Sequence, residues 1–201
     1  MQKVELCEDS ACSTSTTVGD TSASFNIASS SAGAEVGSFA KTTGLPLGTT
    51  FTHLRVTVSR TFTITGSVTT DNGDCMTDGG TDAGATQLLV GKLTGSAVST
   101  SMFLPNTGSY GATDGTRDGD VGSSNIDMDY SSPKFAKSMT VSGSTAAMIY
   151  QLANPYTVKF KSPLIKVKFQ TNDAIGAFRL DADTDVCSMY PEEPLVTIDI
   201  Q

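Results

Sequence analysis

Aspartates in glycine-rich turns are the residues of this chain best suited to bind a ligand. Asp114, Asp118 and Asp120 lie within the sequence DGTRDGD, and further acidic clusters occupy residues 71–82 and 181–185. Calcium takes six to eight oxygen ligands, and such loops can supply carboxylate and carbonyl oxygens together. The EF-hand pattern that ends in a bidentate glutamate is absent, and Asp and Gly also favour turns for conformational reasons. Calcium is therefore the one candidate cofactor, and a plain acidic turn is the alternative.

Groups suited to catalysis are scarce. His53 is the only histidine, so any Ser-His-Asp or Cys-His mechanism would have to use it. It falls on the polar side of a candidate strand, where we expect an exposed structural residue. The sequence lacks a G-x-S-x-G elbow, a P-loop, a G-x-G-x-x-G after a strand and an H-E-x-x-H motif. Its many acids could include a glycosidase pair, but no spacing marks one. We expect that the protein is not an enzyme.

The even number of cysteines indicates disulfides. The four are Cys7, Cys12, Cys75 and Cys187. The first two flank a short segment that could close as a small loop, which would leave the other two to pair. Four cysteines allow three pairings, and the sequence does not choose among them. A zinc site is the rival reading, which the single histidine and the lack of a CxxC pair disfavour. Disulfides predict an oxidising compartment and hence an extracellular or cell-surface location.

The charge and hydropathy of the chain exclude two kinds of partner. The formal net charge is −8 and the sequence pI is about 4.5. An acidic protein repels phosphate backbones, so we expect no nucleic-acid partner. No apolar segment is long enough for a membrane span or for the core of a signal peptide, so none of either is expected here. Export would then require a leader that this sequence does not include.

Residues 52–66 predict one long strand. Leu54, Val56 and Val58 alternate with polar residues, and the inward parity is broken only by Arg60. Further candidate strands are residues 3–6, 23–28, 87–93, 101–104, 138–141, 147–152, 156–160, 164–169, 177–180 and 196–200. Clusters of Gly, Asp, Ser and Pro separate them, and residues 10–22 are expected to form a polar connector. The pattern predicts an all-β protein, a single β-sandwich domain over residues 1–201 of jelly-roll or immunoglobulin-like type. At most one short helix is expected, at residues 34–41.

The C-terminal segment, residues 195–201, is a candidate strand for exchange between chains. Val196, Ile198 and Ile200 share one face, and a proline-rich spacer precedes them. Such a strand can fold into its own sheet or complete the sheet of a neighbour by β-strand addition. In the second case these three side chains would fill the neighbour's groove, and Ile198→Asp would abolish assembly and leave a soluble monomer. The N-terminal segment, residues 1–6, is the rival donor.

With its hydroxyl-rich strands and terminal strand EEPLVTIDIQ, the chain resembles the self-assembling β-sandwich subunits of bacterial extracellular fibres and donor-strand pili. This resemblance implies a structural subunit of a filament or pilus-like polymer, with identical subunits as partners, each accepting a strand from the next. Donor strands in such families are commonly N-terminal, so a C-terminal donor departs from their pattern.

Two other functions remain open on the sequence. One is a secreted adhesin or carbohydrate-binding module that uses the long loop at residues 106–132, with calcium and a glycan as ligands. Tyr110 and Tyr130, in or beside that loop, could stack on a sugar. The other is a phage decoration or fibre protein assembled in the cytoplasm, for which we would expect reduced cysteines.

Overall fold

The chain is all-β in the part that the structure describes. The computed structural model describes residues 1–24, 44–80, 89–103, 112–113, 116–117, 136–160, 163–170, 175–178, 187–191 and 195–200. These residues form antiparallel strands and contain no helix, which confirms the predicted fold class. The candidate helix at residues 34–41 lies outside them. Among the described residues, no helix long and apolar enough to cross a membrane was found.

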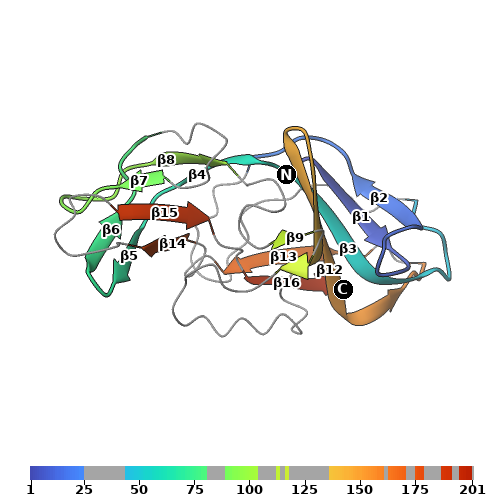
Figure 1. The fold of residues 1–201 in the computed structure, drawn as a ribbon. Coiled ribbons are helices and arrows are strands. Elements are labelled where there is room, and N and C mark those ends of the chain that lie inside the picture. The colour runs from blue at the N-terminus through green and yellow to red at the C-terminus, as the bar shows by residue number, and fades with distance from the viewer. Residues whose placement is uncertain are drawn as a thin grey trace.

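A five-stranded antiparallel sheet forms one half of the molecule (Figure 1). Its spatial order is β11-β12-β3-β1-β2. The strands are β1 (Lys3–Cys7), β2 (Ser15–Gly19), β3 (Thr50–Ser59), β11 (Ala136–Ser142) and β12 (Thr145–Thr157). The segment expected to be a polar connector thus contains an edge strand, β2. The register of β12 shifts between Gln151 and Tyr156, so that two candidate strands are one irregular strand.

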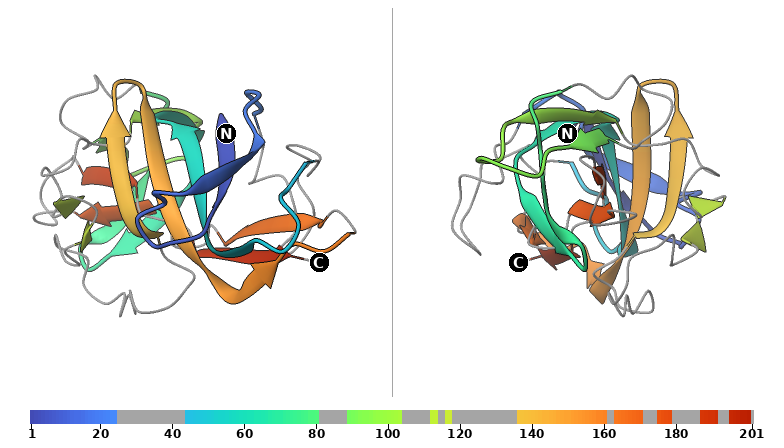
Figure 2. Two further views of the ribbon diagram at one scale, coloured as in Figure 1. Left: turned by 90° about the vertical axis from the view of Figure 1, so that its right-hand side faces the viewer. Right: turned by 60° about the vertical axis from the view of Figure 1, so that its left-hand side comes forward.

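A second layer covers this sheet. It consists of β13 (Ile165–Gln170) and β16 (Leu195–Ile200), paired antiparallel (Figures 1 and 2). Both layers contribute to one buried cluster of apolar side chains. Its members are Val4, Leu6, Phe51, Leu54, Val56, Tyr150, Leu152, Val158, Val196 and Ile198. Two sheets that enclose one apolar core are consistent with the predicted β-sandwich.

The other half of the molecule surrounds a second buried cluster. Its members are Cys75, Met102, Cys187 and Met189. Three small antiparallel sheets enclose them: β4 (Thr61–Ile64) with β8 (Thr100–Phe103), β5 (Ser67–Thr70) with β6 (Gly73–Met76), and β14 (Ile175–Phe178) with β15 (Cys187–Pro191) and β7 (Leu89–Gly91). A further short pair joins β9 (Ala112–Thr113) to β10 (Thr116–Arg117). Figure 1 shows the two halves side by side along the length of the molecule.

The long strand predicted over residues 52–66 is wrong in one respect, because it divides at Arg60. β3 belongs to the five-stranded sheet and β4 pairs with β8 in the other half. Arg60 is 5% exposed, its N–H donates to the carbonyl of Ser144 at 2.9 Å, and its guanidinium donates to the carbonyl of Gly143 at 2.9 Å. The polar residue that interrupts the apolar parity therefore marks the point where the chain passes from one sheet to another.

A disulfide between Cys75 and Cys187 joins β6 to β15 across β7. Both cysteines are buried in the second cluster. Gly91, on β7, lies between them: a Cβ added there would be 2.5 Å from the Sγ of Cys75 and 2.7 Å from the Sγ of Cys187. These separations are far below van der Waals contact, so this position requires glycine for the space it leaves.

We expect Gly91→Ala to lower the free energy of unfolding by about 1–3 kcal/mol, because the added methyl group must displace the sulfurs or the strand. Chemical denaturation would measure the change. The matched control is the same substitution in a Cys75→Ala/Cys187→Ala background, where the removed sulfurs leave space for it. An equal loss of stability in both backgrounds would show that crowding at the disulfide is not the cause.

Candidate assembly site

The C-terminal strand β16 packs in its own chain. It pairs with β13 from Leu195 to Ile200, and the register places Val167 opposite Ile198. Val196 is 1% exposed and Ile198 is 9% exposed, and Ile200 packs against the same cluster half-buried. The alternation of the sequence produces this arrangement, because every second side chain points to the five-stranded sheet. The three residues predicted to fill a neighbour's groove thus fill the equivalent space in the same chain.

Among the described strands, β16 pairs with β13 alone. One ion pair reinforces this ladder, from the Nζ of Lys168 to the Oδ2 of Asp199 at 3.0 Å, between side chains that are both more than 40% exposed. An exposed pair of this kind contributes little to stability. The attachment of β16 therefore depends on one ladder and on the burial of its apolar side chains.

The rival donor, β1, is held more firmly. It lies between β2 and β3 and pairs with both, and its own residues Val4 and Leu6 are buried. Withdrawal of β1 would break two ladders, whereas withdrawal of β16 would break one described ladder. The disulfide between Cys7 and Cys12, with a Cα–Cα distance of 4.9 Å, also closes the turn that follows β1. Of the two terminal strands, β16 is the one whose release disturbs less of the fold.

The structure decides the pairing of the four cysteines, with Cys7 bonded to Cys12 and Cys75 bonded to Cys187. All four cysteines are oxidised and there is no free thiol. Cys187 lies at the start of β15, shortly before β16 in the chain. Its bond to Cys75 anchors β15 to the second half of the molecule, so that β15 would keep its place if β16 left the sheet.

Glu5 lies in a buried ion cluster on the polar side of the five-stranded sheet. Its side chain is 5% exposed, and its carboxylate accepts from the Nε of Arg55 at 2.7 Å and from the Nζ of Lys3 at 2.8 Å. Glu5 and Arg55 are direct cross-strand partners on β1 and β3. The hydrogen bond from Arg55 lowers the pKa of the Glu5 carboxyl to about 2, against the opposing effect of burial. No motif marks this pair in the sequence, because its acid and its base lie on separate strands that meet only in the sheet.

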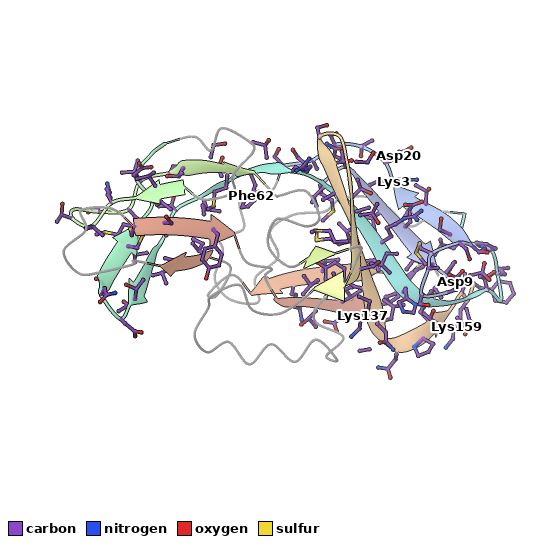
Figure 3. All side chains as sticks on the ribbon, viewed as in Figure 1. Lys3, Asp9, Asp20, Phe62, Lys137 and Lys159 are labelled. Atoms are coloured by element: carbon purple, nitrogen blue, oxygen red, sulfur yellow. A yellow bond between two sulfur atoms is a disulfide. The ribbon has the colours of Figure 1, made fainter. Side chains whose placement is uncertain are left out.

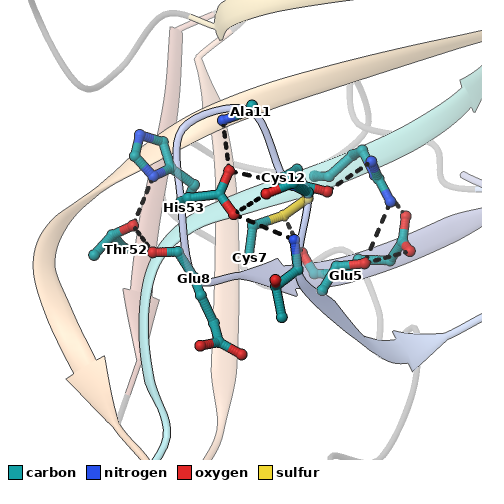
Figure 4. The surroundings of a disulfide bond; sticks show 12 residues. Glu5, Cys7, Glu8, Ala11, Cys12, Thr52 and His53 are labelled. Carbon is teal, nitrogen blue, oxygen red and sulfur yellow. Dashed lines mark hydrogen bonds and ion pairs between the residues drawn. A yellow bond between two sulfur atoms is a disulfide. The ribbon is translucent and has the colours of Figure 1, made fainter.

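The loop between β1 and β2 is organised around Asp9 (Figure 4). Its carboxylate accepts hydrogen bonds from the backbone N–H groups of Ala11, Ser13 and Thr14 and from the Ser13 hydroxyl at 2.6 Å. These bonds lower the pKa of the Asp9 carboxyl to about 2, and the bond from the Ser13 hydroxyl has the largest effect. All of the bonds lie within the loop, so the carboxylate serves the turn and the adjoining disulfide.

His53 is buried at 9% exposure, which corrects the expectation of an exposed strand residue. The hydroxyl of Thr52 donates to the carbonyl of Glu8, and its oxygen lies 2.8 Å from the Nδ1 of His53 (Figure 4). Because the hydroxyl has only one proton, Nδ1 must carry a proton and donate it to the hydroxyl oxygen. Burial lowers the pKa of the His53 imidazole. Its cross-strand partner Cys7 is committed to a disulfide and cannot act as a nucleophile. His53 therefore has a structural role: it binds Thr52, whose hydroxyl binds the loop of Asp9 at Glu8.

The candidate calcium ligands Asp114, Asp118 and Asp120 lie outside the described residues, as does most of the 106–132 loop. Calcium and glycan binding by this loop stay predictions. In the described part, no group of three or more His, Cys, Asp or Glu side chains is arranged to hold a metal ion. On the hairpin of β5 and β6, Asp74 accepts from the Thr69 hydroxyl at 2.8 Å, and after β6 Asp78 accepts from the N–H of Gly80 at 2.7 Å.

We expect Ile198→Asp to destabilise the monomer by about 3 kcal/mol or more, because the change removes buried apolar area and places a carboxylate in the core. The soluble monomer expected from the sequence would therefore be a less stable one. Thermal denaturation would measure it. Thr197→Asp, at the exposed neighbouring position of β16, is the control and should change stability by less than about 0.5 kcal/mol. Equal effects of the two would contradict the burial of Ile198.

Stability should depend on Glu5 in acid. Because the folded-state pKa is lower than the ordinary 4.5, the Glu5 carboxylate stabilises the protein above pH 4.5, and this contribution is lost as the pH falls towards 2. The loss should amount to about 3 kcal/mol. Denaturation of wild type and Glu5→Gln between pH 6 and pH 2 would show a flatter dependence in the variant. Asp9 titrates in the same pH range in both proteins, so its contribution to stability cancels when the two are compared. Parallel curves would refute the assignment.

Comparison of the chain with models of known protein families, with curated proteins and with solved structures found no match. The interpretation of its function therefore depends on the contacts described above.

Proposed function

We propose that this protein is a structural subunit of an extracellular polymer of identical chains, in which β16 is donated from each subunit to the next. The observation that carries the proposal is the attachment of β16: one described ladder holds it, yet Val196 and Ile198 fill the main core. A terminal strand of this kind can be replaced by the same strand of another copy. The main-chain bonds give affinity, and the alternating apolar side chains give the register.

Exchange of β16 would replace each intramolecular contact by the same contact between chains. The net free-energy change is then small, and the equilibrium depends on concentration and on strain in the connecting segment. The barrier is larger, because Val196 and Ile198 must leave the core at a cost of about 1.5–3 kcal/mol each in lost burial. A subunit that gives its strand to one neighbour and accepts from another makes a heterologous contact, which extends into a filament.

The disulfides support an extracellular setting. Cys7 and Cys75 are fully buried, and their partners Cys12 and Cys187 are 4% and 3% exposed. Disulfides persist in oxidising compartments and are rare in the cytosol. The bond between Cys75 and Cys187 would also carry load in a filament, because a force applied to β16 passes along β15, which this bond ties to β6.

Engineered cysteines would show whether β16 exchanges. Lys168 and Thr197 are directly opposite on β13 and β16 and are both exposed, so Lys168→Cys/Thr197→Cys can form a disulfide without entering the core. If assembled protein is oxidised, we expect a ladder of covalent oligomers on a non-reducing gel, because the two cysteines then belong to different chains. If the monomer is oxidised first, the bond forms within one chain and should block assembly.

The control is Thr69→Cys/Asp74→Cys, a pair of exposed opposite positions within the hairpin of β5 and β6. That short hairpin cannot exchange, so its disulfide should give only the monomer band under all conditions. A monomer band alone from the assembled Lys168→Cys/Thr197→Cys protein would refute strand exchange.

A further inference from the structure

The second half of the molecule has a small core that is built around sulfur. Among the described residues, its buried members are Cys75, Met102, Cys187 and Met189. The apolar side chains around them, such as Phe62 (labelled in Figure 3), are only partly buried. The described strands of this half, β4 to β8 with β14 and β15, are at most five residues long and form sheets of two or three strands. Sheets of this size are marginally stable by themselves, so this half depends on what joins them.

The disulfide between Cys75 and Cys187 joins two of these sheets, the hairpin of β5 and β6 and the sheet of β14, β15 and β7. Its cysteines are 112 residues apart in the sequence. A bond that closes so long a loop restricts the unfolded chain strongly, and it therefore stabilises the fold more than a bond across a short loop. One β-bridge in the described residues supports the same junction: Met76 and Lys92 exchange N–H to carbonyl bonds at 2.9 Å and 2.8 Å.

The two bonded sulfurs lie where two separate thiols would not fit. A Cβ added to Gly91 would lie 2.5 Å from the Sγ of Cys75, 2.7 Å from the Sγ of Cys187 and 3.1 Å from the Cγ of Met189. The backbone of β7 thus approaches the bonded pair closely. When the bond breaks, the sulfurs must move apart to van der Waals contact, into space that β7 and Met189 occupy. Reduction therefore removes the crosslink and also overpacks the second core.

The main core is separate from the second one. Among the described residues, no apolar side chain belongs to or packs against both clusters. The disulfide of the main half joins Cys7 to Cys12, only five positions apart, and so restricts the unfolded chain little. Four hydrogen bonds to the carboxylate of Asp9 hold the same loop. The five-stranded sheet, with β13 and β16, therefore has what it needs to stay folded when both disulfides are reduced.

We propose that the bond between Cys75 and Cys187 is a redox switch that controls the folding of the second half. A dithiol reductant opens this half and leaves the main half folded. One thiolate of the dithiol attacks a cysteine sulfur and forms a mixed disulfide, and the other cysteine leaves as a thiolate. The second thiol of the reductant then attacks the mixed disulfide and releases the first cysteine. The reductant becomes a disulfide, and its two protons pass through solvent to the cysteine thiolates.

The switch divides the folding of the chain into two stages. Under reducing conditions only the main half completes its fold, and the second half closes when the cysteines are oxidised. Cys75 is fully buried and Cys187 is 3% exposed, so the closed half must open locally before a reductant can reach the bond. This inference goes beyond strand exchange and does not depend on it, because β16 belongs to the half that stays folded.

Hydrogen exchange measured by mass spectrometry tests the switch on the full chain. Cys75→Ala/Cys187→Ala removes the switch, and Cys7→Ala/Cys12→Ala is the matched control, because it removes the other disulfide. We expect the amides of β4 to β8, β14 and β15 to exchange at least about tenfold faster in the first variant than in the wild type. The amides of β3 and β12 should change by less than about threefold. The control should exchange like the wild type throughout the second half.

The wild type, reduced by excess dithiothreitol without denaturant and then re-oxidised, shows whether the change is reversible. The reduced protein should lose protection in the second half alone and regain it on re-oxidation. The proposal is overturned by unchanged protection without the switch, by loss of protection throughout the chain or by an equal loss in the control. A bond that dithiothreitol leaves intact, or protection that does not return, also overturns it. None of these results bears on the oligomer ladder that tests strand exchange, so the two proposals can fail separately.

Discussion

The structure depends on one buried cation at the junction of its two halves. Arg60 interrupts the apolar parity of the longest strand-like segment, and its guanidinium and N–H bond to the turn between β11 and β12. A buried guanidinium is costly unless its donors find acceptors, and the carbonyl of Gly143 accepts from this one. This requirement fixes the residue at which the chain leaves the five-stranded sheet and enters the second set of strands.

Each half is then stabilised by different means. Among the described residues, the main core buries ten apolar side chains between two layers, whereas the second cluster has four members, two of which are the cysteines of one disulfide. Small cores gain little from burial alone, and a covalent link between distant segments compensates for this. Gly91 leaves the space that the disulfide occupies. The second half is thus held by a bond that survives only under oxidising conditions, which agrees with the proposed extracellular role.

Parts of the site could be predicted from the sequence, and parts could not. The alternation of Val196, Ile198 and Ile200 correctly marks a strand with one buried face, because period-two patterning reports burial directly. It does not report which chain supplies the groove, since a strand makes the same contacts in its own sheet or in another. His53 was expected to be exposed because its parity is polar, but it is buried, and its neighbour Thr52 binds the loop of Asp9 at the carbonyl of Glu8. The parity of a residue shows on which face of the strand its side chain lies. Whether that face is buried depends on residues far away in the chain.

The sequence by itself determined the fold class and the apolar faces of the long strand up to Arg60 and of the C-terminal strand, because these follow from local alternation and turn residues. Only the tertiary structure decided where the long strand divides, that β2 is an edge strand, that Glu5 and Arg55 meet, and which cysteines pair. Each of these depends on contacts between segments far apart in the chain. Such contacts are set by the simultaneous burial of many side chains, which no local pattern encodes.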